Sequence, residues 1–201
     1  ERIVVVGQGT ASIAAMAVSA FVNDSLKGSG VHVDTMKASE LSGFWLEPDM
    51  SQTLVVAVTQ SGATADTNRA VDLARERGAQ TMAIVNRRNS DITFKTAGVL
   101  YTSDGRDVEM SVASTKAFYS QVVAGAVLGL ALGRRARTLS EKRVLAELAL
   151  GLVFSLYYPS MTRALKGVAW PAPRPAGPRA AGRRWPPRSS TRTRSAAHGA
   201  G

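Results

Sequence analysis

The segment around residue 59 constrains the fold most. Leu54–Val58 is a run of apolar, mostly β-branched residues that stops abruptly at the loop Thr59-Gln60-Ser61-Gly62-Ala63-Thr64. A helical pattern follows at once, from Ala65 to about Arg77. A fully apolar strand that feeds directly into a helix is typical of a parallel α/β sheet, in which ligands bind outside the carboxyl ends of the strands.

The loop that follows this strand is chemically suited to an anion. Backbone N–H groups at the start of a helix have no partner within the helix and attract negative charge. The hydroxyl groups of Thr59, Ser61 and Thr64 add donors, and Gly62 lets the backbone come close to a ligand. The loop has no Lys, so it is not a P-loop. We interpret it as a binding loop for a phosphate monoester on a small molecule, with an ordinary strand-to-helix turn as the alternative.

Apolar runs and helical patterns alternate along the chain. Strands are predicted at 3–6, 31–36, 53–58, 81–85 and 98–101, and helices at 11–26, 38–44, 65–77, 90–95, 111–132 and 139–156. This alternation predicts an α/β fold with a five-stranded parallel sheet, right-handed crossovers and helices on both faces. Three loops rich in small and hydroxylic residues, 7–10, 59–64 and 111–115, are candidate ligand loops.

The first long helix has a recognisable apolar face by its spacing. On the segment 11–26 this face consists of Ile13, Met16, Ala17, Ala20 and Phe21. We expect this helix to lie on one side of the sheet.

The net charge of +10 belongs to the C-terminal end of the chain. Residues 1–158 hold all 15 acidic residues and 16 of the 25 Lys and Arg, whereas residues 159–201 hold the other 9 basic residues and 7 of the 8 prolines. The stretch 171–188 has no aliphatic side chain larger than alanine, so we predict that this basic tail is disordered. It is either a nucleic-acid-binding arm, with Arg side chains, Trp170 and Trp185 as contacts, or an unselected sequence such as a frame-shifted read of GC-rich DNA.

Several classes of site and location are disfavoured by composition. The chain has no cysteine, and its two histidines, His32 and His198, lie far apart, so we expect no disulfide, no metal site and no cofactor. Glu1-Arg2 leads straight into a strand, which no export signal does, so we expect a cytoplasmic protein. The first residue is not Met, so we expect the chain to begin inside a longer protein. The apolar run 122–132 is shorter than the roughly 20 residues that span a bilayer, and it predicts a buried helix and no membrane partner.

Two longer motifs carry a family resemblance. Thr59-Gln-Ser-Gly-Ala-Thr-Ala-Asp-Thr67, together with Val112-Ala-Ser-Thr-Lys-Ala-Phe118, resembles the sugar isomerase (SIS) domain of the glutamine–fructose-6-phosphate aminotransferases. Gly9-Thr10 and Ala38-Ser39-Glu40 are lesser matches in the same order. The resemblance implies a flavodoxin-like αβα sandwich that binds a phosphorylated hexose. We therefore expect an SIS domain over residues 1–133, a helical extension over 134–158 and the disordered tail over 159–201.

The resemblance also implies which residues contact the ligand. Thr59, Gln60, Ser61 and Thr64 would hold the phosphate, and Thr10, Val112, Ala113 and Ser114 would contact the sugar. The chain departs from the family at Ala11, where Ser is usual, and at Ala63, where Glu is usual.

Two ionisable residues near the second motif keep two interpretations each. Lys116 either serves the site or is a helix residue that pairs with Glu109 or solvent. Glu109 is either an acid or base near the sugar or a solvated loop carboxylate.

The resemblance implies a fragment of a larger enzyme. Members of this family also have a glutaminase domain, a second SIS domain and a C-terminal tail. The second SIS domain and the tail supply the acid–base Glu, the ring-opening His and the Schiff-base Lys, and none of these roles can be assigned here. We therefore expect a sugar-phosphate-binding fragment that is inactive alone, with a stand-alone or regulatory SIS module as the alternative. Helices 111–132 and 139–156 are apolar enough to predict a homo-oligomer or pairing with a second SIS domain.

Overall fold

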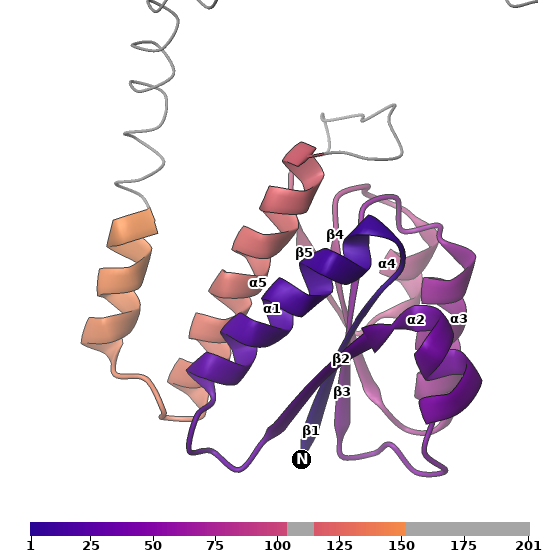
Figure 1. Ribbon diagram of the computed structural model, residues 1–201, viewed down its shortest axis with the longest axis horizontal. Helices are drawn as coiled ribbons and strands as arrows, with labels where there is room; N and C mark the ends of the chain where they lie inside the picture. Colours follow the sequence, from indigo (N-terminus) through magenta and orange to yellow (C-terminus); the bar gives the residue numbers. More distant parts are fainter. Residues whose placement is uncertain (104–114, 152–201) are drawn as a thin grey trace, which may run out of the picture. The chain divides into compact units, whose positions relative to one another are not determined.

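A five-stranded parallel sheet forms the centre of the protein (Figure 1). This computed structural model describes residues 1–103 and 115–151. The strands lie in the order β2-β1-β3-β4-β5. They are β1 (Arg2–Gly7), β2 (His32–Lys37), β3 (Thr53–Thr59), β4 (Gln80–Val85) and β5 (Gly98–Tyr101). The predicted α/β class and all-parallel sheet are confirmed, each strand shifted by one residue at most from its predicted start.

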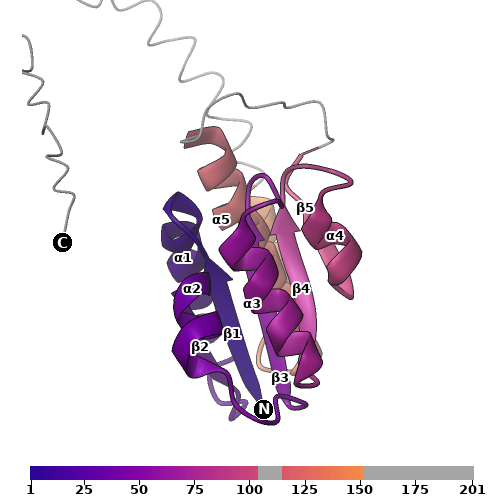
Figure 2. The same cartoon turned by 90° about the vertical axis from the view of Figure 1, so that its right-hand side faces the viewer.

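Helices cover both faces of the sheet, as Figures 1 and 2 show. They are α1 (Thr10–Ser25), α2 (Ala38–Glu40), the π-helix η1 (Leu41–Trp45), α3 (Ala65–Glu76), α4 (Asp91–Lys95) and α5 (Thr115–Arg135), and residues 141–151 are also helical. Successive side chains of a strand point alternately to the two helix layers. Val4 and Val6 face α2, α3 and α4, whereas Ile3 and Val5 face α1 and α5.

The strand order places a change of direction between β1 and β3. These strands are neighbours, with Val6 opposite Ala57, yet β1 leads to α1 on one face and β3 leads to α3 on the other. In an open α/β sheet this switch point at the carboxyl edge is where ligands bind. The loops 7–10 and 59–64 therefore leave the sheet side by side.

The apolar face predicted for α1 is not the face that α1 buries. Ile13 and Met16 are 55% and 56% exposed, whereas the small residues of the helix are buried. These are Ala14, Ala15, Val18, Ser19, Val22 and Ser25. The reason is that α1 lies between the sheet and α5, and a helix with two neighbours needs small side chains on the sides that they approach.

A row of glycines on α5 completes this contact. Gly125, Gly129 and Gly133 are spaced four residues apart, so they share one face of the helix. A Cβ atom added to Gly125 would lie 2.8 Å from Cβ and 2.9 Å from Cγ1 of Val18, which is closer than real Cβ contacts. Just after the end of α5, Thr138 Oγ1 donates a hydrogen bond of 2.5 Å to Ser25 O, at the end of α1. The backbones of α1 and α5 are thus about as close as side chains permit.

The apolar helix α5 has a buried and an exposed side. Among the described residues, its segment Lys116–Arg135 is the one stretch long and apolar enough to cross a membrane by length and composition. Its inner side packs on α1 and the sheet, with Phe118, Val122 and Leu132 against the buried core. Its outer side leaves Tyr119 and Val123 each 62% exposed. Self-association through this outer side stays a prediction.

We expect Gly125→Ala to destabilise the protein by up to about 2 kcal/mol in urea unfolding. Alanine gains about 1 kcal/mol in helix propensity over glycine, but overpacking a close contact costs about 1–3 kcal/mol. Val18 is β-branched and cannot rotate away inside a helix. Gly151→Ala, at a helical glycine with open space around it, is the control and should be neutral or stabilising.

The double variant Val18→Ala/Gly125→Ala should be more stable than the sum of the two single changes predicts. Additive losses would show that the two residues do not compete for the same space.

Candidate functional site

The loop 59–64 is held by its own hydroxyl groups. Thr59 ends β3 and is 2% exposed, and Ser61 and Thr64 are half-buried. Thr59 Oγ1 accepts a hydrogen bond from Gly62 N at 3.2 Å, and Ser61 Oγ accepts one from Ala63 N at 3.3 Å. Both bonds use the oxygen as acceptor, so each O–H group keeps its hydrogen to donate. The loop is therefore built before any ligand arrives.

Alternate carbonyl groups of the loop accept hydrogen bonds from the protein. Arg87 N donates to Gln60 O at 3.1 Å, Ile92 N donates to Gly62 O at 3.1 Å, and Asn68 N donates to Thr64 O at 3.0 Å. The negative ends of these peptide groups are engaged by α3, by the β4–α4 loop and by α4. The first N–H groups of α3 have no partner within the helix. An arrangement of this kind favours an anion at the loop.

Position 62 of the loop accepts only glycine without strain. Its φ angle is +66°, in the left-handed region, and a Cβ atom there would lie 2.6 Å from Cβ of Ser90. The loop therefore packs directly on the start of α4, and any side chain at this position meets both a backbone and a steric penalty.

The loop after β1 lies at the same edge of the sheet. Thr10 is exposed and is the first residue of α1, and Gly9 before it has φ +59° and ψ −131°, a conformation essentially limited to glycine. The Ser12 hydroxyl donates to Gly9 O at 2.7 Å. The hydroxyl hydrogen of Ser12 is thus used within this turn.

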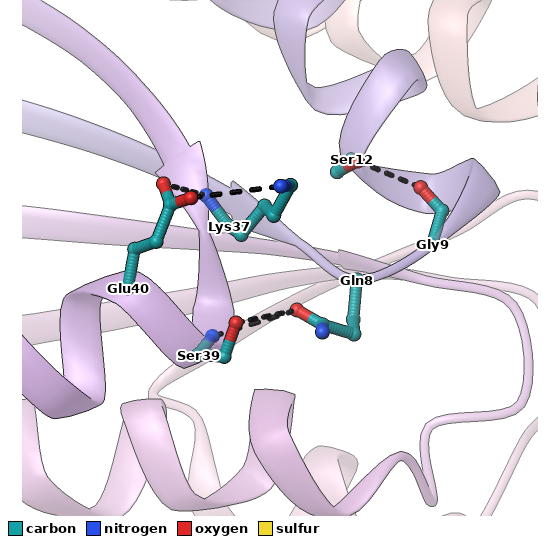
Figure 3. A network of polar contacts seen from close by, with 6 residues as sticks. All are labelled: Gln8, Gly9, Ser12, Lys37, Ser39 and Glu40. Carbon is teal, nitrogen blue, oxygen red and sulfur yellow. Dashed lines mark hydrogen bonds and ion pairs between the residues drawn. The ribbon is translucent and has the colours of Figure 1, made fainter.

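Figure 3 shows how this loop is joined to β2 and α2. Gln8 Oε1 accepts hydrogen bonds from both N and Oγ of Ser39, each at 3.4 Å. Lys37 Nζ lies 3.6 Å from Glu40 Oε1, and Glu40 Oε2 accepts from Lys37 N at 3.4 Å. The lesser motif Ala38-Ser39-Glu40 therefore fixes Gln8 and caps α2, and it leaves the Gln8 amide N–H₂ group at the edge of the site.

Part of the predicted site cannot be placed. Val112, Ala113, Ser114 and Glu109 lie outside the described residues. Lys116 is exposed on the first turn of α5. The structure thus brings Thr10 to the same sheet edge as Thr59, Gln60, Ser61 and Thr64. In the ranges 1–103 and 115–151 no group of three His, Cys, Asp or Glu side chains could hold a metal ion.

The sequence reasoning missed Asn68 as a site-shaping residue. Asn68 Nδ2 donates to Gly62 O at 3.0 Å and to Thr64 O at 3.1 Å, and the residue is 7% exposed. The signal was present, because Asn68 lies one helical turn before the buried Val71. A polar residue on the buried face of a helix needs a hydrogen-bond partner nearby.

The comparisons with known proteins agree on one family. The SIS domain matches residues 1–131. The glutamine–fructose-6-phosphate aminotransferase (isomerizing) of Fusobacterium nucleatum subsp. nucleatum is 39% identical over 143 residues, which are 71% of this chain and 22% of that protein. The same enzyme of Streptomyces coelicolor is 51% identical over 83 residues, 41% of this chain and 13% of that protein.

A solved structure gives the same result. The C-terminal domain of glucosamine-fructose-6-phosphate aminotransferase from Francisella tularensis superposes with a TM-score of 0.63 at 28% identity. The match covers 73% of this chain and 40% of that chain. The chain thus spans less than half of that domain and about a fifth of the Fusobacterium relative.

We expect Gly62→Ala to destabilise the protein more than Gly28→Ala does, as measured by thermal unfolding. Both glycines have positive φ angles, +66° and +84°, so each alanine pays about 1–2 kcal/mol of backbone strain. A Cβ at Gly28 meets nothing within 4 Å, whereas at Gly62 it meets Ser90. The difference between the two variants measures the steric part, and equal losses would mean that α4 gives way freely.

Proposed function

Because the chain belongs to the SIS domain family, we propose that it is the phosphosugar-binding domain of a longer glutamine–fructose-6-phosphate aminotransferase. The whole enzyme would make glucosamine 6-phosphate from fructose 6-phosphate and glutamine. The observation that supports this most is the prebuilt loop 59–64 at the start of α3. Its carbonyl groups already accept hydrogen bonds from other parts of the protein.

The phosphate would be bound by neutral donors. The hydroxyl groups of Ser61 and Thr64, the side chain of Gln60 and the first N–H groups of α3 can share a dianion without a fixed cation. Thr59 is buried in the end of β3, so its main contribution is to hold Gly62 N. This proposal makes Ser61, half-buried at the centre of the motif, a main hydroxyl contact of the phosphate.

The sugar would extend from the loop toward β1. Thr10 lies at the start of α1, which follows the neighbouring strand β1. Val112, Ala113 and Ser114 are proposed as further contacts because of the family resemblance. Gln8, fixed through Ser39, adds a nearby amide at the same edge.

Under this proposal the described residues bind the sugar phosphate but do not include a base positioned for isomerisation. Moving a proton between C1 and C2 of a sugar needs a positioned general base. Glu40 is engaged by Lys37 at the edge of β2, and Asp66 is exposed on α3. We propose that catalysis requires further parts of the whole enzyme. The binding loop without a base also fits the second candidate function, a regulatory module that senses a sugar phosphate.

The domain would work as part of an assembly. The exposed apolar side chains of α1 and α5, among them Met16 and Val123, suit pairing with a second SIS domain or a second copy. A cytoplasmic location fits an enzyme of amino-sugar synthesis, and we propose neither a cofactor nor a nucleic-acid partner.

We expect fructose 6-phosphate or glucose 6-phosphate to raise the melting temperature, and the unphosphorylated sugars to leave it unchanged. A ligand at 100 times its dissociation constant adds about 2.7 kcal/mol of stability. Ser61→Ala should lose most of this shift because it removes a hydroxyl donor from the loop. Ser51→Ala, at an exposed serine before β3, should keep it. No shift with any hexose phosphate would contradict the proposed site.

We expect the chain alone to give no turnover. Incubated with fructose 6-phosphate and either glutamine or ammonia, it should form neither glucosamine 6-phosphate nor glucose 6-phosphate, as followed by mass spectrometry. Product formation that Ser61→Ala abolishes would show that a base lies within this chain after all.

A further inference from the structure

We propose that Asn68 is a positioning residue for the ligand loop. Its side-chain amide holds the carbonyl groups of Gly62 and Thr64 on the protein side, so that these carbonyl oxygens stay turned away from the ligand and the hydroxyl groups of the loop remain free to donate to it. This inference rests on the proposed sugar-phosphate function, and it names the residue that keeps the loop in its anion-receiving form.

The contacts of Asn68 tie both halves of the loop to α3. Its Nδ2 group has two hydrogens and two acceptors, Gly62 O at 3.0 Å and Thr64 O at 3.1 Å. Its backbone N–H also donates to Thr64 O, at 3.0 Å. One residue on the first turns of α3 thus holds the carbonyl at the glycine turn and the carbonyl at the start of the helix.

The geometry identifies which end of the amide faces the loop. Two carbonyl oxygens lie at hydrogen-bond distance from the nitrogen, so the opposite orientation would place three oxygens together. The amide oxygen Oδ1 is buried and has no hydrogen-bond partner among the described residues. Burying an unpaired acceptor costs free energy, and the two hydrogen bonds that Nδ2 donates offset this cost.

Few other side chains could act in this way. Aspartate has no N–H group, and leucine has the same bulk but no donor. A serine at this position can donate one bond back to the carbonyl four residues earlier, which is that of Thr64. It is too short to reach Gly62 as well. The series asparagine, serine, leucine therefore removes the two tethers one at a time.

Loss of the tether should act on binding as well as on stability. Gly62 O would keep only the bond from Ile92 N. A Gly62 carbonyl that is free to turn outward presents a partial negative charge to the phosphate, and rotation of its peptide group breaks the bond from Ala63 N to Ser61 Oγ. Binding is thus weakened by the orientation of peptide groups, although Asn68 is not itself proposed to touch the ligand.

The test compares Asn68→Leu and Asn68→Ser with Thr67→Val. Thr67 is the matched control, since it is the adjacent residue, is 1% exposed, and its Oγ1 has no hydrogen-bond partner among the described residues. Affinity for fructose 6-phosphate and for inorganic phosphate is measured by calorimetry. We expect Asn68→Leu to bind fructose 6-phosphate roughly tenfold more weakly, Asn68→Ser to lie between, and Thr67→Val to match the unchanged chain.

A second readout follows the loop without ligand. The N–H groups of Gly62 and Ala63 are bonded to Thr59 Oγ1 and Ser61 Oγ, so their hydrogen-exchange rates report on the loop. We expect faster exchange in Asn68→Leu and Asn68→Ser than in Thr67→Val. Exchange rates equal to those of the control, or an affinity for Asn68→Leu within about twofold of the unchanged chain, would overturn the role of Asn68.

The two proposals fail in different ways. If the unchanged chain binds neither probe, the sugar-phosphate function is wrong, and the exchange rates alone decide whether Asn68 holds the loop. If Asn68→Leu does not fold, Asn68→Ser carries both measurements, because it keeps one of the two side-chain bonds.

Discussion

The parallel pairing of β1 with β3 is the constraint on which the rest of the structure depends. These two strands are buried inside the sheet. Their positions in the strand order place the helices that follow them on opposite faces. The loops 7–10 and 59–64 consequently start at one point of the carboxyl edge. Two layers of helices then cover the sheet, α1 and α5 on one side and α2, α3 and α4 on the other. The candidate site is a product of this topology before any side chain is considered.

Strands and most helices could be predicted because their signals are local. The runs at β1, β3 and β4 are apolar and β-branched, and Gly78 and Gly62 mark the ends of regular elements, both with positive φ. The burial of α1 could not be predicted in the same way. Spacing alone favoured Ile13 and Met16 as the inner face, but a helix packed between a sheet and a second helix selects by size. That information lies in α5, more than a hundred residues away.

The site was predictable to the extent that it is contiguous in sequence. The loop 59–64 has its hydroxyls, its glycine and its helix start within six residues, and all of them lie together. Its support comes from elsewhere: Arg87 and Ile92 hold its carbonyls from the next crossover, and Ser39 holds Gln8 from the neighbouring one. Such contacts depend on which loops the fold brings together. Only Asn68 had a local signal, as a polar residue on a buried helix face.

The glycine row of α5 has a consequence for the point at which this helix begins. Because Gly125 packs against Val18 without space for a side chain, steric exclusion fixes the position of α5 along the axis of α1. The helix begins at Thr115, immediately after the segment Val112–Ser114 in the chain. The position of the first turn of α5 is therefore determined in the helix interface, at Gly125. A close contact between two helices thus determines where the first turn of α5 lies against the sheet.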